Sequence, residues 1–125
     1  MKKVINSQKA PAAIGPYSQA IEMNGFLFVS GQLPIEAATG LFPSEDIQEQ
    51  TRASLNNIQA ILEEAGLGFE DVVKTTVYLD DIKDFGRMNE VYGQYFQAPY
   101  PARAAFEVGN LPKGAKVEIE VVAAK

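Results

Sequence analysis

The sequence contains neither cysteine nor histidine among its 125 residues. These absences exclude a disulfide, a thiol nucleophile, a zinc site built on Cys or His ligands, and any catalytic triad that needs an imidazole. A site in this chain must use carboxylates, arginine, lysine, tyrosine, hydroxyl groups, backbone amides and water. Carboxylates alone could still hold Mg²⁺ or Ca²⁺, but no EF-hand pattern occurs, and we predict no metal and no cofactor.

The chain is also poor in positive charge. It has 11 Lys and Arg against 16 Asp and Glu, a net charge of −5, and a pI near 4.7. After Lys2-Lys3 the basic residues are scattered singly, so no basic patch is visible. We therefore expect neither nucleic acid nor an anionic membrane as a partner.

Long apolar segments are absent too. No run is long enough to span a bilayer, and the two lysines near the start are not followed by the apolar region of a signal peptide. We therefore expect a cytoplasmic protein. Hydrophobic residues make up 46% of the chain, and its length suits a single domain over residues 1–125.

Turn signals divide the first third of the chain. Asn24-Gly25 separates two strand-like runs, residues 17–23 and 26–30, and this dipeptide is a strong β-hairpin signal. Residues 11–16 are predicted to form an ordered loop. The segment 31–44, with Gly31, Pro34 and Gly40 among its turn residues, is predicted to be a second loop.

Helical spacing predicts two helices. The first covers about residues 44–65, with Ser44 as N-cap, Glu45 and Asp46 in the first turn, and Gly66 just after its end. The second covers about residues 83–96. Its apolar side is predicted to be core and consists of Phe85, Met88, Tyr92 and Phe96.

Three further strands are predicted at residues 72–79, 103–108 and 117–123, and a weak one near Val4-Ile5. The order β-β-β-α-β-α-β-β predicts an α+β fold in which a mixed sheet carries both helices on one face. The other face of such a sheet must meet solvent or another subunit.

The last strand carries candidate acid–base residues. Glu118 and Glu120 alternate with Val117, Ile119 and Val121, so the two carboxylates share one face of the strand. On a partly buried face they repel each other, which raises the pKa of one and suits general acid–base work on water. The alternative is a pair of solvated glutamates on an exposed strand.

Arg103 is the candidate anion-binding residue. It follows Pro99 and Pro101 at the start of a predicted strand, and its guanidinium can grip a carboxylate through two parallel hydrogen bonds. The alternative is a surface arginine, or one paired with Glu107.

Several segments together resemble the Rid/YjgF family of trimeric 2-iminoacid deaminases. In order they are APAAIGPYSQ (residues 10–19), SGQLP (30–34), KTTVYL (74–79), NEVY (89–92), PAR (101–103), LP (111–112) and VEIEV (117–121). Each motif is weak alone, but their ordered combination covers nearly the whole chain.

The resemblance implies a chorismate-mutase-like fold and a homotrimer with a central barrel and clefts between subunits. It also implies cofactor-free hydrolysis of 2-imino or enamine acids, such as 2-iminobutanoate and 2-iminopropanoate, to 2-keto acids and ammonia. Such intermediates escape from pyridoxal-phosphate enzymes, which the deaminase would protect.

By position, the resemblance gives each site residue a role. Arg103 would bind the substrate carboxylate and Glu118 would hold the attacking water, with the Tyr17 hydroxyl as a further catalytic group. The other residues of the implied cleft are Ser30, Gly31, Asn89 and the backbone amide of Ala105. Many members carry Ser-Cys after the arginine where this chain has Ala104-Ala105, which excludes thiol chemistry or redox control at that position.

Most of these residues also have a structural alternative. Tyr17 could be a core or interface aromatic, and Ser30 could cap a turn. Gly31 either lets the backbone approach a ligand closely or is a simple turn glycine. Asn89 could be a surface or capping residue of the second helix.

Two other function classes compete with the deaminase. The same cleft could bind a 2-keto acid or another small carboxylate, as a sensor or a regulatory trimer, without catalysis. Glu118 favours chemistry, because an acidic residue beside an anionic ligand does not help a pure binder. RNA cleavage or translation inhibition, attributed to some relatives, is disfavoured by the acidic pI, the absence of histidine and the lack of a basic patch.

Overall fold

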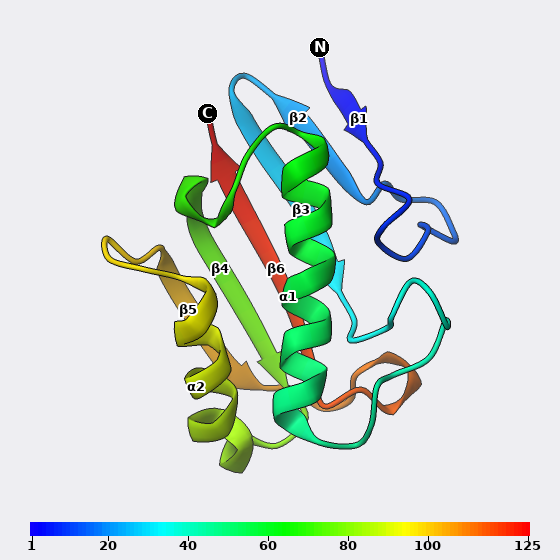
Figure 1. Cartoon of the computed structure of the whole chain (residues 1–125), viewed down its shortest axis with the longest axis vertical. Coiled ribbons are helices and arrows are strands. Elements are labelled where there is room, and N and C mark those ends of the chain that lie inside the picture. The colour runs from blue at the N-terminus through cyan, green and yellow to red at the C-terminus, as the bar shows by residue number, and fades with distance from the viewer.

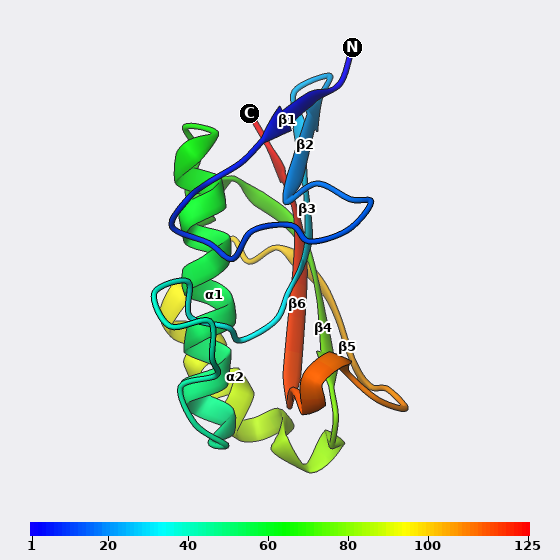
Figure 2. The same ribbon diagram turned by 90° about the vertical axis from the view of Figure 1, so that its right-hand side faces the viewer.

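The computed structural model describes residues 1–125 and places six strands in one sheet with two α-helices on one of its faces (Figure 1; Figure 2). The spatial order is β1-β2-β3-β6-β4-β5, and only the β4–β5 pair is parallel. The strands are β1 (Lys3–Ile5), β2 (Ala20–Met23), β3 (Phe26–Gln32), β4 (Val72–Leu79), β5 (Ala102–Glu107) and β6 (Val117–Ala124). The helices are α1 (Ile47–Glu64) and α2 (Phe85–Tyr95). The predicted order of elements is confirmed.

The β2–β3 hairpin turns at Asn24-Gly25, as predicted. Both residues have positive φ, 53° and 82°, which is the backbone of the turn that matches the twist of the two strands. Met23 and Phe26 form the closing pair of the hairpin. Asparagine and glycine adopt this conformation at little steric cost, so the local sequence fixes this connection.

The predicted bounds of the hairpin strands were wrong at their far ends. β2 begins at Ala20, and the residues from Tyr17 to Gln19 belong to the preceding loop. The buried amide of Gln19 holds this loop by accepting from the Ser7 N–H (2.8 Å) and donating to the Pro11 carbonyl (2.8 Å). β3 continues through Gly31 to Gln32, because β6 supplies Ile119 as a partner beyond a bulge.

The start of α1 also differs from the prediction. The N-cap is Asp46, whose Oδ2 accepts from the Glu49 N–H (3.0 Å). Ser44 acts two residues earlier, where its hydroxyl accepts from the Asp46 N–H (3.0 Å). The end is as predicted: Gly66 has φ +76° and donates to the Glu63 carbonyl (3.0 Å).

Helix α2 begins at Phe85, after a turn of 3₁₀ helix over Ile82–Asp84, and ends at Tyr95. Its inward side is largely as predicted, because Met88, Tyr92 and Phe96 are buried. Phe85 is only partly buried, at the margin of the core.

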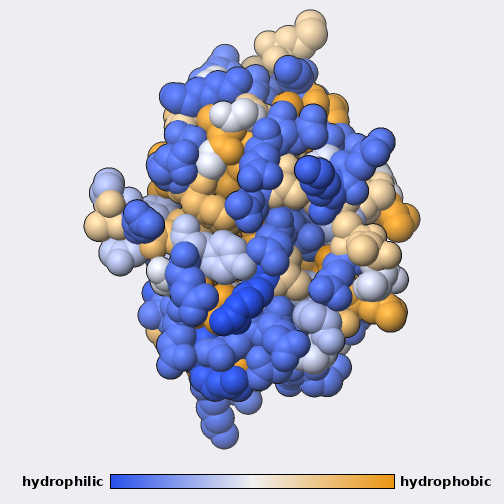
Figure 3. Space-filling model, viewed as in Figure 1, coloured by the Kyte–Doolittle hydropathy of each residue, from blue (hydrophilic) through white to orange (hydrophobic).

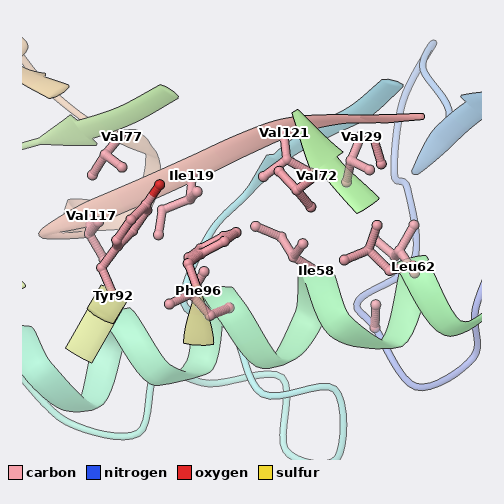
Figure 4. Close-up of a cluster of buried hydrophobic side chains, with 14 of the residues drawn as sticks. Val29, Ile58, Leu62, Val72, Val77, Tyr92, Phe96, Val117, Ile119 and Val121 are labelled. Carbon is pink, nitrogen blue, oxygen red and sulfur yellow. The ribbon is translucent and has the colours of Figure 1, made fainter. Parts of the chain in front are cut away.

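The core fills the space between the helices and one face of the sheet. Figure 4 shows Val117, Ile119 and Val121 of β6 facing side chains from the helices. The outer surface of the helical layer is mostly hydrophilic (Figure 3). Neither α-helix combines the length and the apolar character that crossing a membrane requires.

The opposite face of the sheet, called the open face here, is covered by no helix (Figure 2). Strand register and alternation place large apolar side chains on it, among them Met23, Phe26, Phe28 and Phe106, which are 41–49% exposed. Glu118 and Glu120 lie on this face, because Val117, Ile119 and Val121 of the same strand point into the core.

Candidate functional site

Arg103 lies on β5, the edge strand next to β4. Its Nη1 donates to Asn89 Oδ1 on α2 (2.6 Å), and its guanidinium carbon lies 4.6 Å from the centre of the Tyr92 ring and 5.3 Å from that of Phe85. These contacts fix an exposed guanidinium in one orientation and leave its other N–H groups free to donate.

Tyr92 is itself held in place beneath the arginine. Its hydroxyl forms a 2.8 Å hydrogen bond with the buried Thr75 hydroxyl of β4, and its ring stacks on Phe96. Figure 4 shows the Tyr92 oxygen pointing toward the sheet. Burial raises the pKa of this hydroxyl, which therefore stays protonated at neutral pH.

The surroundings of Arg103 form a shallow recess, called the arginine recess here. Its lining residues are Asn89, Tyr92, Gly93, Tyr100, Pro101 and Arg103. The predicted alternative of an Arg103–Glu107 pair is wrong, because Glu107 Oε1 accepts from the Ile82 N–H (2.9 Å) instead. The recess combines a fixed cation with aromatic walls, which suits a small organic anion.

Glu118 lies against Gly31 of the neighbouring strand. A Cβ atom at position 31 would be 2.2 Å from Glu118 Oε2, so the missing side chain of Gly31 is what makes room for the carboxyl group. Gly31 is therefore not the turn glycine of the sequence alternative: it lies within β3 and has no positive φ. Its role is to let the Glu118 carboxyl group approach the backbone of β3 closely.

Glu118 and Glu120 differ in their surroundings. Burial, and secondly the charge of Glu120, raise the pKa of the Glu118 carboxyl group, as the sequence predicted for one member of the pair. Glu120 Oε1 accepts a hydrogen bond from the Tyr78 hydroxyl, which raises the pKa of Tyr78 to about 12. We call Gly31, Tyr78, Glu118 and Glu120 the carboxyl patch.

Ser30 directly precedes Gly31 of the carboxyl patch in the chain, and Tyr17 lies near Gly31 in space. The Ser30 hydroxyl donates to the Ser18 carbonyl (2.6 Å), so Ser30 ties β3 to the loop that carries Tyr17 and caps no turn. Tyr17 is 54% exposed and lines, with Gly31 and Gln32, a cavity of about 480 Å³. It is not a core aromatic of this chain.

Ala105 lies on β5 two residues after Arg103. Its side chain packs against the core, and it pairs with Val77 of β4. Because β5 is the last strand of the sheet, its backbone lies at an uncovered edge close to the arginine recess.

The structure brings the predicted residues together in two groups. Arg103 and Asn89 meet on the helical side of the sheet, while Glu118 and Gly31 meet on the open face and Ser30 directly precedes Gly31 in β3. Register confirms the separation: Arg103 pairs with Thr75, which points to α2, and Glu118 pairs with Tyr78. A single chain therefore does not place the guanidinium and the Glu118 carboxyl group in one cleft.

Sequence reasoning missed the parts played by Tyr92 and Tyr78. Tyr92 was assigned only to the core, although it also lies beneath Arg103. Tyr78 alternates with the buried residues Val77 and Leu79, a period-2 pattern that does place it on the face of the two glutamates. Its contact with Glu120 joins residues 42 positions apart, which no local pattern indicates.

Comparison with known proteins supports the family resemblance. Residues 7–125 match the family described as endoribonuclease L-PSP. The chain is 55% identical over 124 residues to a RutC family protein of Pyrococcus abyssi, covering 99% of this chain and 98% of that protein. It is 50% identical over 123 residues to a 2-iminobutanoate/2-iminopropanoate deaminase of Bos taurus, covering 98% and 90%. It matches the crystal structure of E. coli TdcF with bound serine at a TM-score of 0.94 and 46% identity, covering 98% of each.

Proposed function

Because the chain belongs to the Rid/YjgF family, which matches it from residue 7 to residue 125, we propose that it is a cofactor-free deaminase of small 2-imino and enamine acids. The products are the 2-keto acid and ammonia, and 2-iminobutanoate and 2-iminopropanoate are the proposed substrates. The proposed role, in the cytoplasm, is to protect pyridoxal-phosphate enzymes from these reactive intermediates.

The observation that carries the proposal is the fixed guanidinium of Arg103. Asn89 and the Tyr92 ring hold it while it faces outward, so it can bind a carboxylate without first being ordered. A 2-imino acid presents such a carboxylate next to the reacting carbon. Binding through two parallel hydrogen bonds fixes the plane of the C=N group as well as its position.

Hydrolysis then needs a placed water and a proton for the leaving nitrogen. Glu118 is the proposed residue for the water, because it is a half-buried carboxyl group whose pKa is raised by burial and by the neighbouring Glu120, which favours its acid form. The Tyr17 hydroxyl, Ser30, the Gly31 backbone and the Ala105 amide are the proposed remaining contacts. An imine is already electrophilic, so these groups meet a modest catalytic demand.

The proposed site needs more than one chain. Arg103 and Glu118 lie on opposite sides of the sheet, so a cleft that contains both takes the arginine recess of one subunit and the carboxyl patch of another. We propose a homotrimer whose sheets line a central barrel. The exposed aromatic side chains on the open face, Phe26, Phe28 and Phe106, support this arrangement, because contact between subunits would cover them.

A second candidate function is binding of a small carboxylate without catalysis, in a sensor or regulatory trimer. The arginine recess favours it, because a carboxylate clamp is complete without the carboxyl patch. The crystal structure of E. coli TdcF contains bound serine, which carries a carboxylate, and this supports the second candidate. The raised pKa of Glu118 supports the enzyme over the binder, since a binder has no use for a titrating acid beside its anion.

A coupled assay tests the proposal. Threonine dehydratase generates 2-aminocrotonate and 2-iminobutanoate, and release of 2-ketobutyrate is followed with and without this protein. We expect the protein to accelerate release, and Arg103→Ala to lose about a hundredfold in rate because a charged hydrogen-bonding partner is removed. Arg87→Ala is the matched control, since Arg87 pairs with Asp46 on the surface away from the recess.

A folded, trimeric wild-type protein that does not change the rate of 2-ketobutyrate release would reject the enzyme and leave carboxylate binding as the function. Equal acceleration by wild type and Arg103→Ala would reject the role of Arg103 in binding the substrate. Light scattering that shows a stable monomer would reject the cleft between subunits.

A further inference from the structure

Glu118 and Glu120 are chemically identical side chains, two residues apart on the same face of β6, yet their contacts are unequal. The Tyr78 hydroxyl donates to Glu120 Oε1. Tyr78 lies opposite Glu118 in the β4–β6 ladder, so its side chain crosses diagonally to reach the other glutamate. Glu118 instead lies in the space left by Gly31.

The tyrosine is held in this position by a second contact. Its ring meets the Phe106 ring of β5 edge to face, with centroids 5.5 Å apart at 89°. Phe106 is the register partner of Tyr78 on the open face. The hydroxyl is therefore directed by packing on one side and by the Glu120 acceptor on the other.

This asymmetry has a chemical consequence. A hydroxyl that donates to a carboxylate stabilises the negative charge of that carboxylate, and a fixed negative charge makes a neighbouring acid harder to ionise. We propose that Glu120, fixed by Tyr78, is a positioning residue whose retained charge makes Glu118 the carboxyl group that carries the exchangeable proton. This inference rests on the proposed deaminase function and assigns the proton within its site.

The pKa values of both groups agree with the geometry. Burial and then the neighbouring Glu120 raise the pKa of Glu118, whereas the hydrogen bond to Glu120 is the main cause that raises the pKa of Tyr78. Tyr78 therefore remains a donor throughout the working pH range. Burial favours the acid form of Glu118.

The groups that face Glu118 are few. Its own strand contributes Glu120, β4 contributes Tyr78, and β3 contributes Gly31, which carries no charge. Tyr17 and Lys113 line the cavity that Gly31 also borders. Lys74 shares the open face but lies opposite Val122, beyond Glu120. In the proposed trimer, Arg103 of the partner subunit and the carboxylate that it binds would add one charge of each sign.

One carboxyl group that starts as the acid can serve the whole hydrolysis. Glu118 gives its proton to the imine nitrogen and becomes a carboxylate. A water oxygen then bonds to C2 while the C=N π electrons move to nitrogen, and the surplus water proton returns to Glu118. In the last step Glu118 protonates the amine, the C–N bond breaks with its electron pair leaving as ammonia, and the C2 hydroxyl proton returns to Glu118. The sum is imine plus water to ketone plus ammonia.

The decisive experiment titrates Glu118 directly. Carbon-13 NMR of the glutamate carboxyl carbons follows the protonation of Glu118 in the full-length protein, and the signal is identified by its loss in Glu118→Gln. We expect Glu120→Gln to lower the titration midpoint of Glu118 by on the order of one pH unit, because the adjacent charge is gone. Tyr78→Phe should lower it less, because Glu120 keeps its carboxyl group but competes for the proton.

The same variants change the activity profile. If the acid form of Glu118 is the active one, kcat/KM falls as pH rises through its midpoint, and this falling limb moves to lower pH in Glu120→Gln. Glu64→Gln is the matched control, because it removes one charge from the exposed side of α1 and should move neither midpoint.

A Glu118 midpoint that stays in place in both folded variants would overturn the inference. The NMR readout needs no turnover, so the two proposals fail separately. A shifted midpoint in a protein without deaminase activity would support the Glu120–Glu118 coupling and reject the enzyme. Full activity with an unmoved midpoint would support the enzyme and reject the Glu120–Glu118 coupling.

Discussion

The two faces of the sheet are made of the same strands, but different things cover them. On the helical face, Val117, Ile119 and Val121 of β6 are buried beneath α1 and α2. On the open face the same strand carries Glu118 and Glu120, next to aromatic side chains that are almost half exposed. One face is complete within the chain, and the other has polar and apolar groups that no part of the chain covers.

The helical face therefore contributes to folding stability, and the open face carries the groups that can react. A packed apolar face contributes free energy to folding but offers no group that can react. The open face holds a titrating acid, a hydroxyl donor and a glycine that admits the acid, at little cost to the core. The arginine recess lies on the helical side at the edge of the sheet, where the edge strand β5 meets α2.

The largest expected difference between the two faces comes from truncating one residue of β6 on each face. Ile119→Ala removes a fully buried side chain, and we expect a loss of about 2–5 kcal/mol in the free energy of unfolding. Val122→Ala, on the open face of the same strand, should cost below about 1 kcal/mol. Urea denaturation measures both losses in the free energy of unfolding. Equal losses would mean that side chains on the open face are as fully buried as those on the helical face.

The next effect is on activity. Gly31→Ala adds a methyl group where Glu118 Oε2 lies, and the flexible end of the glutamate can move away, so the protein should fold. We expect about a hundredfold lower deaminase rate, because the carboxyl group is displaced by around 1 Å. Gly86→Ala in α2 is the control, since its added methyl meets no atom. Unchanged activity in Gly31→Ala would separate Glu118 from the reaction.

A smaller effect tests the hydrogen bond beneath Arg103. Tyr92→Phe leaves the buried Thr75 hydroxyl without its partner, and we expect a loss of about 1–2 kcal/mol in unfolding free energy. The ring remains under the guanidinium, so activity should survive. Tyr95→Phe is the matched control, because its hydroxyl bonds to Asn56 at the surface. Thermal or urea unfolding that gives equal values for both variants would contradict the prediction.

The smallest effect is a pH dependence of stability. The pKa of Glu118 is raised above 4.5 in the folded state, so its contribution to stability is present below pH 4.5 and is lost as pH rises through the folded value. Wild type should therefore lose stability relative to Glu118→Gln as the pH rises across this range. Urea midpoints measured from pH 4 to pH 8 give the difference.

Asp46 provides a contrast of opposite sign. Its pKa is lowered, chiefly by the hydrogen bond from the Glu49 N–H, so its contribution is present above pH 3.8 and is lost as pH falls. Wild type and Asp46→Ala should converge in acid, whereas wild type and Glu118→Gln should diverge with rising pH. If the stability difference between wild type and variant changed with pH in the same direction for both pairs, the assignment of Glu118 would be rejected.

Local signals in the sequence were enough for the order of the elements. Asn24-Gly25 predicted the hairpin, the alternation in residues 117–121 predicted which side chains of the last strand share a face, and Gly66 predicted the end of α1. The ends of β2 and β3 that were wrong depend on distant partners. Gln32 extends β3 because Ile119 pairs with it, and Gln19 keeps the segment before β2 in a loop through contacts with Ser7 and Pro11.

The residues of the candidate site were named from the sequence, by the family motifs, but their arrangement was not. Period-2 alternation places Glu118 opposite the core side chains of its own strand, and it says nothing about Arg103 on another strand. The parallel register of β4 with β5, the two helices on one face and the diagonal reach of Tyr78 to Glu120 decide that arrangement. Side-chain period and turn chemistry depend on neighbours in the chain. Which residues meet across a sheet depends on register and packing between segments far apart in sequence, and these exist only in the folded protein.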